Sequence, residues 1–369
     1  MLTLSPSPVV AADADCSPAK HKKTLIRRTT SDRSQQVRRA VQFAFLLLNA
    51  AIGLQFLLWV RYFENGGKAH YFERPAGVDG WLPIAGLMNL RYFFAVGKIP
   101  PIHPSAMVLL CVFLLASLLV KKSFCSWLCP VGTLSEYLWK FGRKISRRNL
   151  VAPKWLDIPL RGLKYALLAF FVFIVFTMPA MGLGNFLASP FGIVADVKML
   201  NFFRYMGTMG MVVVLVLVVL SVLVQNFWCR FLCPYGALMG IVSALSPVKI
   251  RRDAEACIDC GKCNRACPSQ LLVDRLVQIR SVECTGCMEC VAVCPAENAL
   301  QMALMPRKSE ATTNARWQGR VLKPQVIAAV LAIVFFGLIG AARATGHWQT
   351  NISHETYMQL VPNAENFDH

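Results

Sequence analysis

The stretch "CSWLCPVG" (residues 125–132) ends one apolar run of the chain, and a close copy, "CRFLCPYG" (residues 229–236), ends a second one. Corresponding cysteines are 104 residues apart, and both copies follow the pattern Cys-x-x-Leu-Cys-Pro-x-Gly-x-Leu. An aromatic segment and an apolar span precede each copy. We therefore interpret the pair as a parallel repeat, in which both copies cross a membrane in the same direction. Both cysteine pairs are then expected at the same membrane face.

The composition is typical of a membrane protein. The 369 residues are 55% hydrophobic and carry a formal net charge of +19, and a basic excess suits a cytoplasmic membrane face. No nucleic-acid fold signature occurs, so no nucleic-acid partner is expected. Five stretches have about the 20 apolar residues that a membrane span needs: 41–60, 104–120, 162–181, 207–227 and 324–342.

The distribution of basic residues predicts the orientation of these spans. The N-terminal tail and the segment 121–161 are both rich in Lys and Arg, and are therefore expected in the cytoplasm. An even number of spans must then separate them. Two further apolar stretches, 81–96 and 185–200, are accordingly expected at the outer face and not across the membrane.

A twin cysteine run is the most specific signal in the chain. "CIDCGKCNRACP" (257–268) and "CTGCMECVAVCP" (284–295) both read C-x2-C-x2-C-x3-C-P. In this bacterial ferredoxin run the first three cysteines bind one cubane, and the fourth ligates the other cluster. Zinc is the disfavoured alternative, because the third and fourth cysteines with proline do not form a zinc-ribbon pattern. The predicted ligands are Cys257, Cys260, Cys263 and Cys294 for one [4Fe–4S] cluster, and Cys284, Cys287, Cys290 and Cys267 for the second.

The repeated C-x3-C-P motif predicts a further site. Proline favours the first position of a new helix, so Cys129 and Cys233 are expected as N-cap residues, where the positive helix end stabilises a thiolate. After Pro130, an apolar face predicts an amphipathic helix at the membrane interface; its residues are Leu134, Leu138, Phe141 and Ile145. Facing pairs could frame an iron–sulfur centre or a copper ion on Cys125, Cys129, Cys229 and Cys233. Dithiol redox handling and simple packing are the alternatives.

The predicted fold is an α-helical polytopic membrane protein of about five spans, with a cytoplasmic ferredoxin-like α+β insert that carries two [4Fe–4S] clusters. We expect a bacterial inner-membrane protein with its N-terminus and insert in the cytoplasm and its C-terminus in the periplasm. The predicted parts are a basic tail (1–40), a membrane domain with two parallel repeats (41–248), the ferredoxin-like domain (249–305), a basic linker (306–323), the last span (324–342) and an outer tail (343–369).

Several isolated residues are weaker candidates. His103 could accept a quinol proton or anchor a helix end, since histidine titrates near neutrality. His347 and His354 could contact a partner or a metal. Arg91 and Arg204 could bind lipid or quinone headgroups, or extend along apolar surface to reach water. The two cysteines outside the motifs are expected to ligate nothing: Cys111, which packs within a span, and Cys16 in the tail.

The chain resembles the NapH/NosR-type membrane polyferredoxins, which include the YccM-like proteins. The resemblance covers roughly 40–310 and rests on the two C-x3-C-P motifs, the twin ferredoxin run, and "GWLPIAGLMNLRYF" (80–93) followed by "HPSA" (103–106). It implies a membrane electron-transfer component, in some members linked to quinol oxidation and to periplasmic reductases. The expected partner is thus a reductase, multihaem cytochrome or flavoprotein, with a quinone as a further cofactor.

Other functions stay open at this point. CcoG-type assembly factors, thought to handle copper, have similar motifs, so reduction of a metal for a respiratory enzyme is the alternative. A membrane anchor with structural clusters is a third reading. Any enzyme activity would be that of a quinol dehydrogenase-type subunit. Because a hydrocarbon core is about 30 Å thick, electrons that cross it would need an extra cofactor, a quinone or a partner subunit.

Overall fold

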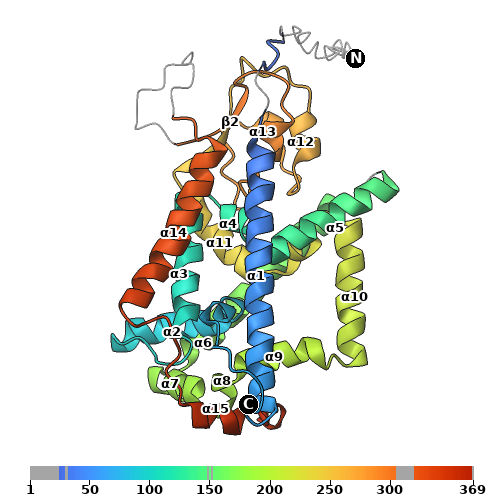
Figure 1. Ribbon diagram of the computed structural model, residues 1–369. Coiled ribbons are helices and arrows are strands. Elements are labelled where there is room, and N and C mark those ends of the chain that lie inside the picture. The colour runs from blue at the N-terminus through green and yellow to red at the C-terminus, as the bar shows by residue number, and fades with distance from the viewer. Residues whose placement is uncertain (1–24, 30–31, 148, 151–152, 305–319, 368–369) are drawn as a thin grey trace, which may run out of the picture.

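The computed structural model describes residues 25–29, 32–147, 149–150, 153–304 and 320–367. Long helices run between two ends of the molecule (Figure 1). A cysteine-rich module (248–304) lies at one end, beside the start of α1 (Ser34–Glu64). The C-terminal helix α15 (His354–Leu360) and the short helix η4 (Ala364–Asn366) belong to the opposite end.

Five apolar helices of the described chain run along this direction: α1, α3 (Pro104–Leu119), α6 (Lys154–Thr177), α10 (Thr208–Leu223) and α14 (Pro324–Ala344). By length and composition, α1, α6 from Trp155 onward, and α14 could each cross a membrane. α10 qualifies only together with α9 (Ala195–Arg204), against which it is bent by 82°. The structure therefore supports three to four spans of the five that the sequence predicts.

α3 is too short to qualify as a membrane span. It has 16 residues, which at 1.5 Å per residue gives about 24 Å, less than the roughly 30 Å of a hydrocarbon core. α10 also has 16 residues. Both helices end where a C-x3-C-P motif turns the chain, so the motif cysteines lie below the module end and not at the tips of full-length spans.

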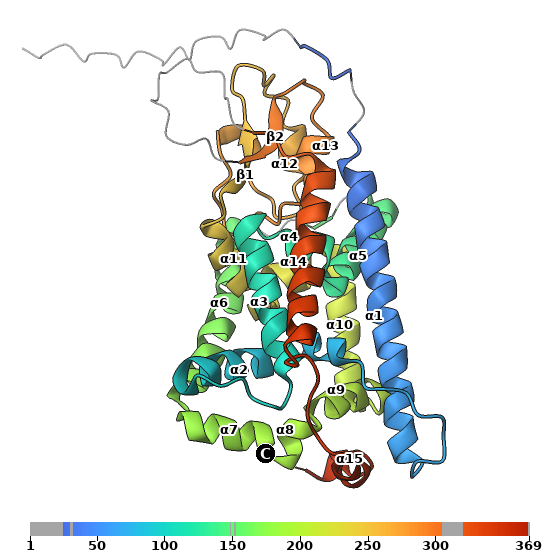
Figure 2. The same ribbon diagram turned by 60° about the vertical axis from the view of Figure 1, so that its left-hand side comes forward.

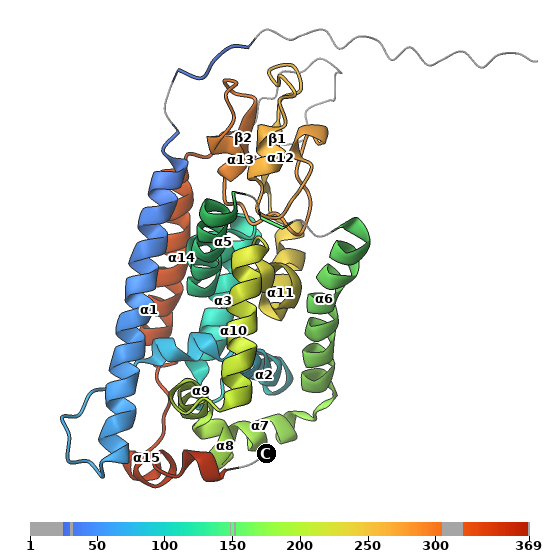
Figure 3. The same ribbon diagram turned by 90° about the vertical axis from the view of Figure 1, so that its right-hand side faces the viewer.

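Packing distinguishes α3 from the other long helices. α3 is apolar on all sides and buried, with contacts to α2 (Pro83–Val96), α11 (Pro234–Ala244) and α14, as expected of a helix without a polar face. α6 and α10 instead expose large apolar side chains, such as Phe173 and Leu215. Figure 3 shows α6 on one side of the bundle, α1 and α14 on the other, and α3, α10 and α11 between them. Such exposed apolar surface suits a lipid environment.

Several short helices lie across the long ones at the end opposite the module (Figure 2). They are η1 (Ala76–Trp81), α2, α7 (Ala180–Ala188), α8 (Pro190–Ile193) and α9. Both stretches for which the charge pattern predicts no crossing, 81–96 and 185–200, lie in this layer.

Each C-x3-C-P motif forms a turn between two helices. The first runs from α4 (Ser123–Trp127) to α5 (Pro130–Ser146), with Cys129 as the N-cap residue. The second runs from a π-helical turn, η2 (Trp228–Leu232), to α11, with Cys233 as N-cap and its sulfur accepting a hydrogen bond from the Gly236 amide at 3.2 Å. New helices therefore begin at both prolines, as predicted.

The expected amphipathic helix is α5. Its exposed apolar face lies opposite buried Trp139 and Gly142. Gly142 sits against α10, where a Cβ atom would come within 2.0 Å of the Val222 carbonyl oxygen. This contact fixes how α5 leaves the bundle. The exposed side chains are Leu134, Tyr137, Phe141 and Ile145, and Leu138 is half-buried.

The module is a small α+β unit. Strands β1 (Val248–Arg252) and β2 (Leu300–Leu304) pair antiparallel, with Val248 opposite Leu304. Between them lie α12 (Lys262–Ala266), η3 (Val273–Arg275) and α13 (Glu289–Ala292). Residues 25–29 of the basic tail lie along the module: the Arg28 amide donates to the Pro295 carbonyl, and the Glu297 amide donates to the Ile26 carbonyl, both at 3.0 Å.

Candidate metal–sulfur centres

The structure brings Cys257, Cys260, Cys263 and Cys294 around one small pocket. We call these four residues the first cysteine set; it is the group that the sequence assigns to one cluster. Gly261 has a left-handed φ of 65°, which lets the loop turn tightly between Cys260 and Cys263. Cys257 and Cys263 are buried, whereas Cys260 is exposed. The first set is thus open to solvent at one corner.

The second cysteine set consists of Cys267, Cys284, Cys287 and Cys290. The Cys290 thiol lies within electrostatic range of the other three. Burial raises the pKa of Cys287 to about 12 and that of Cys290 well above its usual value, because an isolated thiolate loses its hydration there. Four thiolates could coexist at this site only around cations, so the donor set fits a metal–sulfur cluster.

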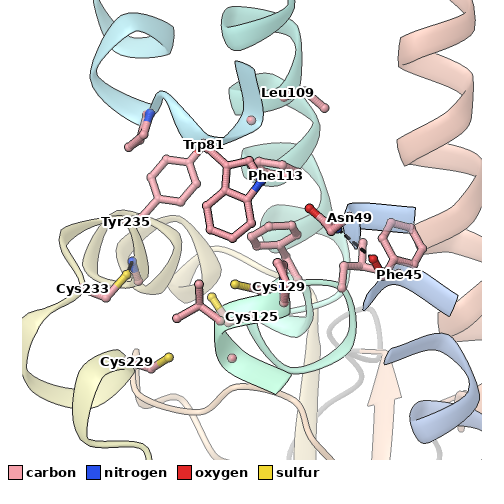
Figure 4. Close-up of a pocket in the computed structure, with 18 of the residues that line it drawn as sticks. Phe45, Asn49, Trp81, Leu109, Phe113, Cys125, Cys129, Cys229, Cys233 and Tyr235 are labelled. Carbon is pink, nitrogen blue, oxygen red and sulfur yellow. Dashed lines mark hydrogen bonds between the residues drawn. The ribbon is translucent and has the colours of Figure 1, made fainter. Parts of the chain in front are cut away.

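Both C-x3-C-P motifs open onto one large cavity of about 960 Å³, here called the central cavity. Figure 4 shows the sulfurs of the four motif cysteines facing a common space, with the rings of Trp81 and Tyr235 beyond it. Cys287 of the second set also lines this cavity. Toward the opposite end of the molecule the cavity reaches Arg74, Arg343 and Trp348. The motif cysteines are Cys125, Cys129, Cys229 and Cys233.

The spacing of the motif cysteines tests which metal group they fit. A single tetrahedral ion with metal–sulfur bonds of about 2.3 Å holds its sulfurs about 3.8 Å apart. Among the described residues, no three of the four sulfurs lie within 4.8 Å of one another. Burial raises the pKa of Cys125 to about 11 and that of Cys129 to about 12. No three of these sulfurs are thus close enough to bind one ion together, and burial opposes ionisation of Cys125 and Cys129 without nearby cations. A group of several metal ions, whose ligands lie further apart, is compatible with this arrangement.

A glycine holds the first motif together. Gly132 follows Pro130 by two residues, and a Cβ atom there would lie 2.1 Å from the Cys125 carbonyl oxygen. The first turn of α5 therefore packs directly on the backbone of the preceding cysteine. The equivalent Gly236 leaves 3.5 Å to the Cys229 carbonyl oxygen, an ordinary contact.

The loop of the second cysteine set is bonded directly to α4. Ser126 Oγ donates to the Thr285 carbonyl at 2.7 Å, and Trp127 Nε1 donates to the Gly286 carbonyl at 3.2 Å. Gly286 fits here because a Cβ atom would lie 2.7 Å from Ser123 Oγ, and its φ is 63°. The residues next to Cys287 and next to Cys125 are thus in contact.

A buried ion network fastens the same region to α1. Arg38 is fully buried and donates to both carboxylate oxygens of Glu136 at 2.6 Å and to Glu289 at 3.0 Å. Lys140 bonds the same two carboxylates, at 2.6 and 2.9 Å. Glu289 lies between Cys287 and Cys290, so one guanidinium joins α1, α5 and the second cysteine set. The sequence pattern does not reveal this network, although Glu136 is a rare acid within a basic segment.

A second charged group lies between α6 and the module. Lys164, buried within an apolar helix, bonds Glu283 at 2.6 Å, and the Tyr165 hydroxyl donates to the same carboxylate at 2.9 Å. Burial opposes ionisation of Glu283, but the charges of Lys122 and Lys164 outweigh it and lower the pKa of this carboxyl. A lysine inside an apolar run was the available signal.

Of the weaker candidates, His103 is engaged in structural contacts. His103 is buried as the N-cap of α3; its Nδ1 lies 2.9 Å from Asp79, and its Nε2 lies 3.0 Å from the Gly192 carbonyl. Asp79, His103 and Asp196 offer ligand atoms within 4.8 Å of one another, but the Arg74 guanidinium already bonds both carboxylates. The arrangement is a satisfied ion network that anchors the start of α3.

The two arginines bind protein groups on neighbouring helices. Arg91 donates to the Val175 and Met178 carbonyls at the end of α6, and Arg204 pairs with Glu64 at 2.7 Å. Both partners lie on neighbouring helices, which sequence periodicity does not reveal.

The remaining weak candidates lie outside the candidate centres. His347 is exposed, and His354 packs against the rings of Tyr62, Phe63 and Tyr71. Cys111 is half-buried in α3, and Cys16 lies outside the described residues.

Comparison with known families assigns iron–sulfur descriptions to these regions. Residues 102–149 and 206–253 match a family model described as a 4Fe–4S binding domain, and residues 249–301 match one described as a 4Fe–4S dicluster domain. The first description thus matches both copies of the repeat, including the motif cysteines. No solved structure matches the chain.

Curated relatives match at greater length. A protein of Escherichia coli (strain K12), named provisionally as electron transport protein YccM, is 49% identical over 90% of this chain and 91% of its own length. The ferredoxin-type protein NapH of the same organism is 25% identical over 70% of this chain and 85% of its own. Regulatory protein NosR of Pseudomonas aeruginosa is 30% identical over 49% of this chain and 25% of its own length.

Proposed function

The chain belongs to the family of membrane-bound 4Fe–4S proteins that includes YccM, NapH and NosR, and from this membership we propose an order for its redox sites. It is an iron–sulfur electron-transfer protein. Iron–sulfur clusters at such cysteines take up and release single electrons. We propose two [4Fe–4S] clusters, one on each cysteine set of the module, and a third multi-iron centre on the motif cysteines.

The order follows from exposure and contact. The first set has an exposed corner at Cys260, so it is the site that a soluble redox protein can approach. The second set lies deeper, and its Cys287 lines the central cavity. The motif cysteines face that cavity below the module. The exposure of Cys260 and the position of Cys287 therefore support an order in series, from solvent toward the interior of the bundle.

One observation carries this proposal. The carbonyls of Thr285 and Gly286 accept hydrogen bonds from Ser126 Oγ and Trp127 Nε1, on the two residues that directly follow Cys125. A direct contact between the loops of two metal-binding sites keeps their separation short and fixed, as electron transfer requires. Arg38, through Glu136 and Glu289, holds the same two loops in one position.

The central cavity supports a quinone as the further redox partner. Its wall is mostly apolar and includes Phe45, Phe113, Trp81 and Tyr235, which suits a hydrophobic ring with few polar contacts. It runs from Cys287 to Arg343 near the opposite end. A quinone in this cavity would carry electrons between the clusters at the module end and the opposite end of the molecule, a distance that the clusters alone do not cover. The acceptor or donor protein beyond it belongs to the class of reductases, cytochromes or flavoproteins.

Charge supports the orientation. The segment 121–161 is rich in Lys and Arg, and its described part contains α4 and α5, at the module side of the bundle. We propose a multi-pass inner-membrane protein with this side, the module and the N-terminus in the cytoplasm. The C-terminal tail then lies in the periplasm.

Purification without oxygen tests the proposal. The protein in lipid nanodiscs should contain iron without copper, and a quinol analogue should reduce its clusters within seconds of mixing. Dithionite gives the full extent of cluster reduction for comparison. The Cys111→Ser variant is the control for loss of a cysteine that lies outside the proposed metal sites. Bound copper, or reduction of added Cu(II) with no response to quinol, would instead support a metal assembly factor.

A further inference from the structure

We propose that Lys122 balances the charge of the centre on the motif cysteines and raises its reduction potential. This inference rests on the proposed function, since it requires that centre. Lys122 lies three residues before Cys125 and lines the central cavity together with all four motif cysteines. Its residue exposure is only 3%.

Lys122 differs from the other buried lysines near the module in having no direct partner. In the part of the chain that the structure describes, its Nζ makes no hydrogen bond or salt bridge. Lys121 donates to the Ser281 carbonyl at 3.0 Å, Lys164 pairs with Glu283 at 2.6 Å, and Lys249 donates to the Ala244 carbonyl at 2.6 Å. A buried ammonium without such partners is costly, and the carboxylate on which Lys122 acts, Glu283, is already bonded to Lys164.

On the side of the motif cysteines next to α6, the cations outnumber the acids, whereas the cavity acids Glu136 and Glu289 are paired with Arg38 and Lys140. Lys122 and Lys164 both act on the single carboxylate of Glu283. Asp157 is likewise shared by Arg161 and Arg230, each at 2.6 Å. The Nε atom of Arg230, another cavity residue, is buried without a hydrogen-bond partner. The cavity wall next to the motif cysteines thus suits a group of net negative charge, such as thiolate-ligated iron.

The repeat makes this role specific to its first copy. The position 104 residues after Lys122 is Asn226, which also lines the cavity, and its Oδ1 atom is buried without a partner. The first copy therefore supplies a cation where the second supplies an amide. The Lys122 charge acts on the thiols of both copies, on Cys125 and on Cys229. A fixed cation at the junction of the two copies affects the whole centre and not one ligand.

The sign of the effect follows from Coulomb's law. When the centre accepts one electron from a reductant, its negative charge increases by one unit and its attraction to a nearby fixed cation grows. Lys122 therefore favours the reduced form. Removal of its charge should lower the reduction potential of this centre, while the two module clusters, which face other charges, should keep theirs.

The experiment is a redox titration of the full chain in nanodiscs, followed by electron paramagnetic resonance and iron analysis. In Lys122→Met, the reduced-to-oxidised ratio of the third signal at the wild-type midpoint should fall about tenfold, a shift of 59 mV for one electron. The two module signals should not move. Lys122→Arg should keep the wild-type midpoint, since the charge remains. Lys121→Met, the buried neighbour with carbonyl partners, should leave the third signal unchanged.

Each result decides the proposal. An unmoved third signal in Lys122→Met with full iron content would overturn it, as would an equal shift in Lys122→Arg. If Lys122→Met lost the third centre, its retention in Lys122→Arg would support charge balance, and its loss in both would overturn it. A wild-type protein with only two signals would refute the third centre itself, and the role of Lys122 with it.

Discussion

At the scale of single residues, the cysteines of the two module sets and of the two C-x3-C-P motifs have distinct environments. Cys260 is exposed, Cys263 and Cys290 are buried, and Cys129 and Cys233 cap new helices. The differences arise from the residues between the cysteines: glycines with positive φ turn the module loops, and proline starts the helices after the C-x3-C-P motifs. The residues at these intervening positions should therefore be as important for forming the metal sites as the cysteines themselves.

The two motif glycines give a matched test. Gly132→Ala should lower stability by about 1–3 kcal/mol through overpacking, because its Cβ would meet the Cys125 carbonyl at 2.1 Å. Gly236→Ala, with 3.5 Å available, should be close to wild type. Thermal unfolding and iron content of both variants, measured without oxygen, check this. Equal losses in the two variants would show that the close approach does not matter.

The sequence predicts the cysteine sites far better than the charges that support them. The cysteine grouping in the module follows from spacing within a short segment, and the new helices follow from Pro130 and Pro234. Arg38 and Lys122 are different. Their importance depends on residues that are distant in the sequence: Glu136 and Glu289 for Arg38, and the second repeat for Lys122. From the sequence alone, a basic residue near the end of a span is equally well explained as an orientation signal.

At the scale of elements, helix length decides where the motif cysteines lie. The spans 104–120 and 207–227 were predicted at nearly full membrane length, but α3 and α10 have 16 residues each. Apolar composition continues past their ends into the turns, so hydrophobicity alone could not locate the boundary. The shorter helices bring the motif cysteines toward the central cavity, and α5 and α11 cover them.

The attachment of the module to α1 and α5 can be tested at one residue. Among the described residues, Arg38→Met would leave Lys140 as the only cation bonded to Glu136 and Glu289. Loss of one charged partner from a buried ion group typically costs about 3–5 kcal/mol. Hydrogen exchange of residues 285–290 and of the first turns of α1 should become faster. Arg39→Met is the control, because Arg39 is exposed and its side chain bonds no group but the Gln35 carbonyl in the described part of the chain. Similar exchange in both variants would contradict the role of Arg38.

At the scale of the whole molecule, the two ends have different chemistry. The module end contains the cysteine sets and basic residues, whereas the opposite end is closed by short helices around the buried network of Arg74, Asp79, His103 and Asp196. Because this network joins η1, the start of α3 and the start of α9, it should stabilise the fold without taking part in electron transfer.

The buried network at the opposite end should make the stability of the protein depend on pH. Burial opposes a charged His103, but the Asp79 carboxylate outweighs it and raises the pKa of the imidazole above about 6.5. Its stabilising contribution is then complete below that value and is lost as the pH rises through the folded-state pKa. The difference in unfolding temperature between wild type and His103→Gln should shrink from about pH 6 to about pH 9. A constant or growing difference would contradict this assignment.

The central claim is that the two cysteine sets and the four motif cysteines, twelve cysteines together, hold iron in three connected sites. The most direct measurement is the iron and sulfide content of anaerobically purified protein, for wild type, Cys125→Ser and the control Cys111→Ser. We predict about twelve irons in wild type and in Cys111→Ser, and about eight in Cys125→Ser, since each cubane contains four. About eight irons in wild type, or copper or zinc at the motif cysteines, would contradict the account.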